Sequence, residues 1–178
     1  PSFAPNSARE MIAHVKPLPG KFFFASPGPG SANRLEMERF MKATGISMTH
    51  VPYKGGAGPA ITGLLGGETS AMFVTLSSAA NHVRNGKLKL LAVAAPKRLE
   101  LFPNVPTLAE EGLPEMTAGS WQGVLAPAGT PAEIVAKLYG VVLQVMNAPE
   151  VRQRLAAGGV EVVTSRSPAE FASFIAQE

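Results

Sequence analysis

The stretch Thr49-His-Val-Pro-Tyr-Lys-Gly-Gly56 decides the fold class, together with the glycine-rich segment Ala25-Ser-Pro-Gly-Pro-Gly-Ser31 that precedes it. Apolar residues lead into both segments. Residues 22–24 and 48–53 therefore predict two short buried strands, each followed by a loop that feeds a helix. Repeated strand, loop and helix junctions are typical of open α/β sheets, which bind small molecules at the carboxyl ends of their strands.

The composition indicates a folded protein and excludes several function classes. Of 178 residues, 46% are hydrophobic and 16% are charged, unlike the charge-rich composition of disordered chains. The net charge is only +3, and the basic residues are scattered without runs, so we expect no nucleic-acid partner. The absence of cysteine excludes disulfides and thiolate sites. No apolar run approaches the roughly 18 residues of a membrane helix, so we expect no direct membrane insertion.

The first two thirds of the chain repeat the same order of elements. Ser7 and Glu10 form a capping-box pattern before a short helix that ends near Pro17. Further helices are predicted at residues 31–43, at 57–65 and after 75–78, and further strands at 71–74 and 88–94. The sequence therefore predicts a doubly wound, mostly parallel α/β sheet.

The last third of the chain has a different composition and a different order of predicted elements. The proline-rich residues 96–114, with a small helix capped by Thr107 and Glu110, predict a crossing between lobes. Beyond them the patterns predict strands at 120–125 and 160–163 and helices at 131–146, 149–157 and after Ser167, the first of them capped by Thr130. These helices have too few strands for a sheet of their own. They either pack on the first part or complete a lobe of a longer protein, and the start at Pro1 without a signal segment favours the latter.

The glycine-rich loop is a candidate anion site. Gly28 and Gly30 permit a backbone that turns N–H groups inward, and the helix after Ser31 adds a partial positive charge, which favours a carboxylate or phosphate. The alternative is a tight strand-to-helix turn without a ligand. A dinucleotide fingerprint is excluded, because Asn33 occupies the position of its third glycine.

Hydroxyl groups follow the other strands. Thr75, Ser77 and Ser78 come directly after a buried strand, where they either donate to a ligand carboxylate or cap the next helix. Tyr53 is favoured over Lys54 as a ligand contact, although a tyrosine here is often part of the core with a satisfied hydroxyl.

Nothing in the sequence indicates an enzyme. The three histidines, His14, His50 and His82, fall at unrelated spacings, and neither a nucleophile elbow nor a metal-binding pair is present. The carboxylates lie mainly on predicted helices and indicate solvated faces and caps rather than an acid and base pair. We therefore expect no catalytic residue, no metal and no cofactor.

Four motifs together resemble the Bug family, the TctC-like periplasmic solute receptors of tripartite tricarboxylate transporters. They are the segments 25–31 and 49–56 quoted above, and two later segments, Pro106-Thr-Leu-Ala-Glu-Glu-Gly112 and Ala126-Pro-Ala-Gly-Thr-Pro131. The resemblance covers the whole chain. It implies a type II periplasmic binding protein fold whose two lobes close on a small carboxylate and deliver it to membrane permease subunits. Because family members are longer, it also implies that the signal peptide and most of the first lobe are absent. Residues 1–125 would be the second lobe with hinge segments, and residues 126–178 the C-terminal portion of the first lobe.

The resemblance places the ligand loops of the second lobe on residues 26–31, 53–56 and 74–78. The candidate ligand-binding residues are Ser26, Gly28, Pro29, Gly30, Ser31, Tyr53, Thr75, Leu76 and Ser77. Val74 departs from the family, which commonly has an aspartate there. The implied function is capture of a di- or tricarboxylate, an acidic amino acid or an aromatic acid in the periplasm. The alternative is the effector-binding domain of a transcriptional regulator, which shares the two-lobed fold.

Overall fold

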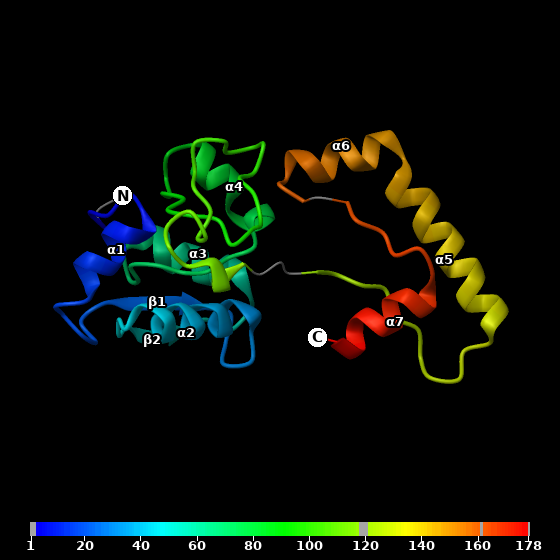
Figure 1. Ribbon diagram of the computed structural model, residues 1–178, viewed down its shortest axis with the longest axis horizontal. Helices are drawn as coiled ribbons and strands as arrows, with labels where there is room; N and C mark the ends of the chain where they lie inside the picture. The colour runs from blue at the N-terminus through cyan, green and yellow to red at the C-terminus, as the bar shows by residue number, and fades with distance from the viewer. Residues whose placement is uncertain (1–2, 118–120, 161, 178) are drawn as a thin grey trace. The chain divides into compact units, whose positions relative to one another are not determined.

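The computed structural model describes residues 3–117, 121–160 and 162–177 (Figure 1). The chain separates into two compact units, which we call unit 1 (Pro1–Ser120) and unit 2 (Trp121–Glu178). The assignment of these units to the lobes of a longer protein stays a prediction.

A small parallel sheet organises unit 1. Strand β1 (Phe23–Ser26) pairs with strand β2 (Thr49–Pro52), with Phe23 opposite Thr49 and Ser26 opposite Pro52. On its other side β1 pairs in parallel with Ala71, whose carbonyl accepts the Ala25 N–H at 3.0 Å. The three segments run in the same direction, so their carboxyl ends meet at one edge of the sheet.

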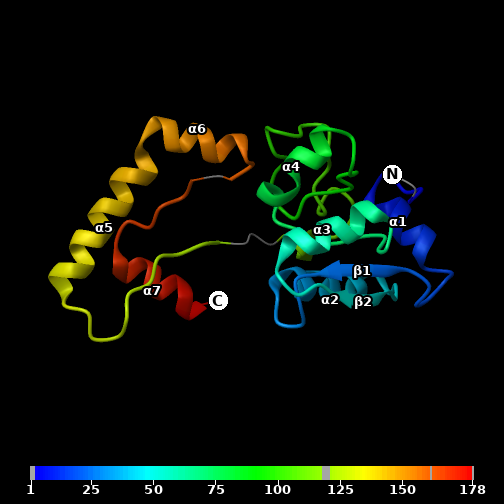
Figure 2. The same cartoon turned by 180° about the vertical axis from the view of Figure 1, so that it is seen from behind.

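Helices follow the strands in the order that the sequence predicts. Unit 1 contains α1 (Ala8–Val15), α2 (Ala32–Thr44), α3 (Ala57–Gly66), α4 (Leu76–Arg84) and the 3₁₀-helix η1 (Pro114–Met116). Both α2 and α3 pack on β1, and they flank it in Figures 1 and 2. The predicted helix boundaries hold at α2, where the Ser31 hydroxyl accepts the Arg34 N–H and Gly45 ends the helix in the left-handed conformation.

The core of unit 1 lies on both faces of β1. Phe24 is fully buried and packs in a cluster with side chains from α1, α2 and the 108–116 segment, whose other members include Met11, Val15, Met37, Phe40, Leu108, Leu113 and Met116. Ala25 is also fully buried, and its side chain points to the opposite face, where α3 packs. Each large apolar side chain buried here contributes about 1.5–3 kcal/mol. This burial on two faces is what a doubly wound arrangement requires.

Several expectations for unit 1 were wrong. Of the strand predicted at residues 71–74, only Ala71 pairs with the sheet, as a single bridge. Residues 88–94 do not form a strand, because Val93 pairs with the 106–108 segment instead of the sheet: its N–H donates to Pro106 and its carbonyl accepts from Leu108. Residues 96–114 contribute Leu108 and Leu113 to the core of unit 1, and their place at a crossing between lobes stays a prediction. Burial of these two leucine side chains holds residues 108–113 in unit 1.

The predicted capping box at Thr107 does form, but no helix follows it. The Thr107 N–H donates to the Glu110 carboxylate at 2.8 Å, and the Glu110 N–H donates to the Thr107 hydroxyl at 3.1 Å. Gly112, at φ 97°, and Pro114 end the turn before a second helical turn can form.

Unit 2 consists of α5 (Ala132–Asn147), α6 (Pro149–Ala157) and α7 (Pro168–Gln177), with α5 packed against the other two. None of these helices has a fully buried residue, and Leu125 and Val163 are 72% and 83% exposed. Ser167 accepts the Glu170 N–H at the start of α7, as predicted. Thr130 does not cap α5, because its hydroxyl donates to the Pro127 carbonyl.

The two strands predicted for unit 2 are not found where the structure describes them. Ser120 and Glu161 lie outside the described residues, while residues 121–125, 160 and 162–163 have no strand conformation. Strands persist only when hydrogen-bonded to a neighbour in a sheet. In the described parts of unit 2 neither segment pairs with a strand. Of the helices in the described residues, none is long and apolar enough to cross a membrane.

The difference in burial predicts unequal stability of the two units. We expect backbone amides in α5 and α7 to exchange with solvent much faster than those in β1 and α2, because few apolar contacts oppose local opening in unit 2. Hydrogen exchange followed by mass spectrometry measures this directly. Equal protection of α5 and α2 would contradict it.

Gly63 in α3 predicts a sharp steric test of unit 1. A Cβ at Gly63 would overlap the Tyr53 hydroxyl, whereas a Cβ at Gly66 of the same helix would meet nothing within 4 Å. We expect Gly63→Ala to lower the free energy of unfolding by about 1–3 kcal/mol. The matched control Gly66→Ala is expected to raise it by up to about 1 kcal/mol through better helix propensity. Urea denaturation of both variants checks this, and similar effects would show that Tyr53 does not pack on Gly63.

Candidate functional site

Three loops meet at the carboxyl edge of the sheet, and we call residues 26–31, 53–56 and 74–77 the strand-end loops. One hydrogen bond ties the first loop to the second, and another ties the start of α2 to the segment just before the third loop. The Tyr53 N–H donates to the Ser26 carbonyl at 2.9 Å, and the Asn33 side-chain amide donates to the Phe73 carbonyl at 3.0 Å. The expected convergence of the strand ends is therefore present in unit 1.

Three helices begin at these loops, and two of them begin without a side-chain cap. Neither Gly56, before α3, nor Thr75, before α4, makes a side-chain hydrogen bond to its helix. The first-turn N–H groups of both helices are therefore left without a side-chain acceptor. Uncapped helix N-termini carry partial positive charge and bind anions such as carboxylates.

In the glycine-rich loop the Gly28 N–H binds a side chain of the loop itself, whereas the sequence predicts N–H groups that face a ligand. Gly28, at φ 146°, donates its N–H to the Ser26 hydroxyl at 3.1 Å, and its carbonyl accepts the Ser31 hydroxyl at 2.8 Å. Both hydrogen bonds of Gly28 therefore stabilise the loop itself, and its backbone conformation is one that favours glycine. Pro29 and Gly30 lie on the exposed side of the loop. A ligand role for these residues stays a prediction.

Ser26 is fully buried and contacts a residue that the sequence reasoning left without a role. Its hydroxyl lies 2.6 Å from Nε2 of His50, whose ring stacks on Phe24 at 4.9 Å between centroids. Burial, and after it the positive charge of Arg34, lowers the pKa of His50, while Glu38 opposes the shift. The contact depends on the strand register, which places His50 opposite Phe24, two residues before Ser26.

Tyr53 is held by α3 and the turn after it. Its hydroxyl donates to the Glu68 carboxylate at 2.7 Å, and burial, followed by this hydrogen bond, raises the pKa of the phenol. The hydroxyl is thus satisfied within unit 1, as the alternative interpretation from sequence had it. Lys54 is exposed.

The third loop offers the most accessible hydroxyls. Thr75 and Ser77 are exposed, and Leu76 is half-buried. The expectation that one of these hydroxyls caps the helix is wrong for Thr75, the N-cap residue. The Thr75 hydroxyl makes no hydrogen bond to α4, and a ligand role for Thr75, Leu76 and Ser77 stays a prediction.

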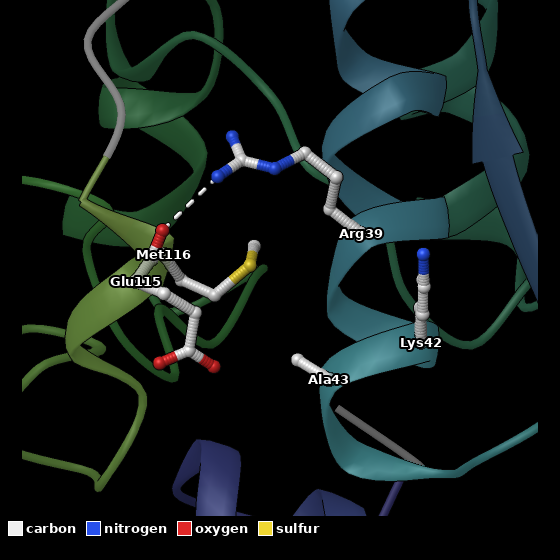
Figure 3. A pocket seen from close by; sticks show the side chains of 5 residues that line it. All are labelled: Arg39, Lys42, Ala43, Glu115 and Met116. Atoms are coloured by element: carbon white, nitrogen blue, oxygen red, sulfur yellow. Dashed lines mark hydrogen bonds between the residues drawn. The ribbon is translucent and has the colours of Figure 1, made fainter.

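A separate hollow of about 420 Å³ lies near the other end of α2, lined by Arg39, Lys42, Ala43, Glu115 and Met116 (Figure 3). Arg39 reaches across it and donates to the Glu115 carbonyl at 3.0 Å. Arg39, Lys42 and Ala43 lie 7 to 11 residues after the start of α2 at Ala32, so they are about 10–17 Å along the helix from the first strand-end loop. It lies near the carbonyl end of α2, and its charged lining consists of two cationic side chains, Arg39 and Lys42, and one carboxylate, Glu115. Within the described residues no cluster of acidic or histidine side chains could hold a metal ion.

Comparison with known proteins identifies relatives of the whole chain. The BugT protein of Bordetella pertussis is 36% identical over 178 residues, which is all of this chain and 54% of BugT. The structure of the periplasmic binding protein BugD matches with a TM-score of 0.92 at 31% identity and covers 99% of this chain and 59% of BugD. MatC from Rhodopseudomonas palustris, solved with bound malate, matches with a TM-score of 0.90 at 32% identity and covers 99% and 60%.

The chain thus spans between half and two thirds of the length of these relatives, and it has the fold of the matching part of periplasmic binding proteins. The model of the tripartite tricarboxylate transporter family receptor matches residues 1–178. The chain belongs to the tripartite tricarboxylate transporter receptor family.

Proposed function

We propose that the strand-end loops form one wall of a binding site for a small carboxylate, within a receptor that serves a tripartite tricarboxylate transporter from the periplasm. The observation that carries the proposal is the meeting of three helix N-termini at one sheet edge, two of them without a side-chain cap. The site needs no chemistry of its own, so the protein acts as a receptor and not as an enzyme.

The physical basis is complementarity between backbone amides and a carboxylate. Hydrogen bonds from backbone N–H groups to a charged acceptor contribute about 1.5–3 kcal/mol each. The malate bound in the structure of MatC is a dicarboxylate, which makes this ligand class the natural choice for the present chain. Val74, where the family commonly has an aspartate, removes one polar contact and leaves the amides as the main ligand contacts.

The proposal includes a second wall and a membrane partner. Receptors of two lobes close around their ligand through contacts from both sides. We propose that the other wall belongs to the region of the longer relatives that has no counterpart in this chain, and that permease subunits receive the ligand. A role as effector domain of a transcriptional regulator has no observation in its favour, since the receptor family matches the whole chain.

We expect the chain by itself to bind malate weakly, because one wall supplies only part of the contacts. Isothermal titration calorimetry at low salt should give a dissociation constant well above micromolar. The affinity should fall further with added salt, as for any exposed charge interaction. Micromolar or tighter binding would contradict the two-wall account, and a complete absence of binding at millimolar malate would count against the carboxylate site.

Leu76 allows one backbone donor to be removed without disturbing the helix. It is the first residue of α4, a position that accepts proline, and the preceding Thr75 already has the extended conformation that a following proline requires. We expect Leu76→Pro to weaken malate binding about tenfold, since one charge-assisted hydrogen bond is lost. The control Leu76→Ala keeps the N–H and should keep most of the affinity. NMR titration measures both, and equal affinities would show that the α4 N-terminus does not contact the ligand.

A further inference from the structure

The buried hydroxyl of Ser26 connects His50 to the glycine-rich loop. It lies 2.6 Å from Nε2 of His50, 3.1 Å from the Gly28 nitrogen and 3.1 Å from the Gly28 carbonyl oxygen. A serine hydroxyl has one proton to donate and two lone pairs that accept. The Gly28 N–H is necessarily a donor, so the proton of Ser26 goes either to His50 or to the Gly28 carbonyl.

The arrangement of the other donors favours His50 as the acceptor. The Gly28 carbonyl already accepts the Ser31 hydroxyl at 2.8 Å and the Ser31 N–H at 3.2 Å, which occupy its two lone pairs. When Nε2 of His50 carries no proton, the Gly28 N–H donates to the Ser26 hydroxyl and the Ser26 hydroxyl donates to Nε2, so each donor has its own acceptor. When the ring is doubly protonated, Nε2 becomes a donor, and Ser26 must add a third donor to the crowded Gly28 carbonyl.

We propose that neutral His50 is a positioning residue, which holds the Gly28 loop through Ser26, and that its protonation loosens the loop and weakens ligand binding. The first part stands on the geometry alone. The second part rests on the proposed function, since it concerns the ligand of the strand-end loops.

The surroundings of His50 set the direction of the pH dependence. The charged groups that face it are Arg34 and Glu38 of α2, which form a salt bridge at 3.3 Å, while Phe24 covers the ring from β1. Burial, followed by Arg34, holds the pKa of His50 below its ordinary value of 6.5 in the folded protein. The unfolded chain therefore takes up the proton first as pH falls. The stabilisation is complete above 6.5 and is lost as pH falls through the depressed folded value.

The test follows the Gly28 amide by ¹⁵N NMR in the full chain without ligand, across the pH range from 8 to 5. The wild-type amide shift should titrate together with the His50 ring, with a midpoint below 6.5. In His50→Gln the side-chain oxygen accepts the Ser26 proton and does not titrate, so the shift should be flat and the amide protected from exchange. In His50→Leu the Gly28 amide should exchange at least about tenfold faster, as for one lost hydrogen bond.

Two controls separate a local effect from a loss of fold. Amides within α2 should keep their protection in both His50 variants, and His14→Gln, which changes an exposed histidine on α1, should leave Gly28 unaffected. A Gly28 amide that ignores pH in the wild type, or that stays protected in His50→Leu, would overturn the positioning role.

A second measurement tests the consequence for the ligand. Malate affinity at pH 7.5 and 5.5 is compared between the wild type and His50→Gln, so that protonation of malate itself cancels. We expect the wild type to lose more affinity on acidification than His50→Gln, and equal losses would overturn this part. If malate binds at neither pH, the proposed function is at fault, while the Gly28 readout still decides the role of His50.

Discussion

The parallel pairing of β1 with a neighbour on each side is the constraint on which the candidate site depends. β2 and the residues around Ala71 both run parallel to β1, so three strand ends, three loops and three helix N-termini occur at one edge. The burial of Phe24 on one face and Ala25 on the other fixes the central position of β1. Any change that displaced β1 would separate the loops and remove the concentration of backbone donors.

The two units of the chain differ in how many of their residues are buried in a core. Unit 1 has a buried core that includes residues from its helices, its central strand and the 108–116 segment. Unit 2 has helices with no fully buried residue and an extended segment, 121–125, that is exposed throughout. This contrast agrees with a chain that spans little more than half the length of its relatives.

The sequence predicted those elements whose formation depends on local signals. The helix predicted at 31–43 and the helix predicted after Ser167 both begin close to where the pattern placed them, because capping is decided by a few neighbouring residues. Strands were expected at 88–94, 120–125 and 160–163, and the described residues of these ranges form none. An apolar run shows that a segment can be buried, but a strand forms only where a neighbouring segment pairs with it over several residues. In residues 88–94 only Val93 pairs, through a single bridge to Thr107.

The same distinction applies to the candidate site. The loops could be located from Gly28, Gly30 and the hydroxyl residues, whereas the internal use of the Gly28 amide and the bond between Ser26 and His50 depend on tertiary geometry. A map of backbone amide shifts of the full chain during titration with malate would locate the ligand contacts. We predict that the largest changes fall on residues 28–33, 55–58 and 75–78. Changes centred on Arg39 and Lys42, or spread without preference over unit 1, would contradict this prediction.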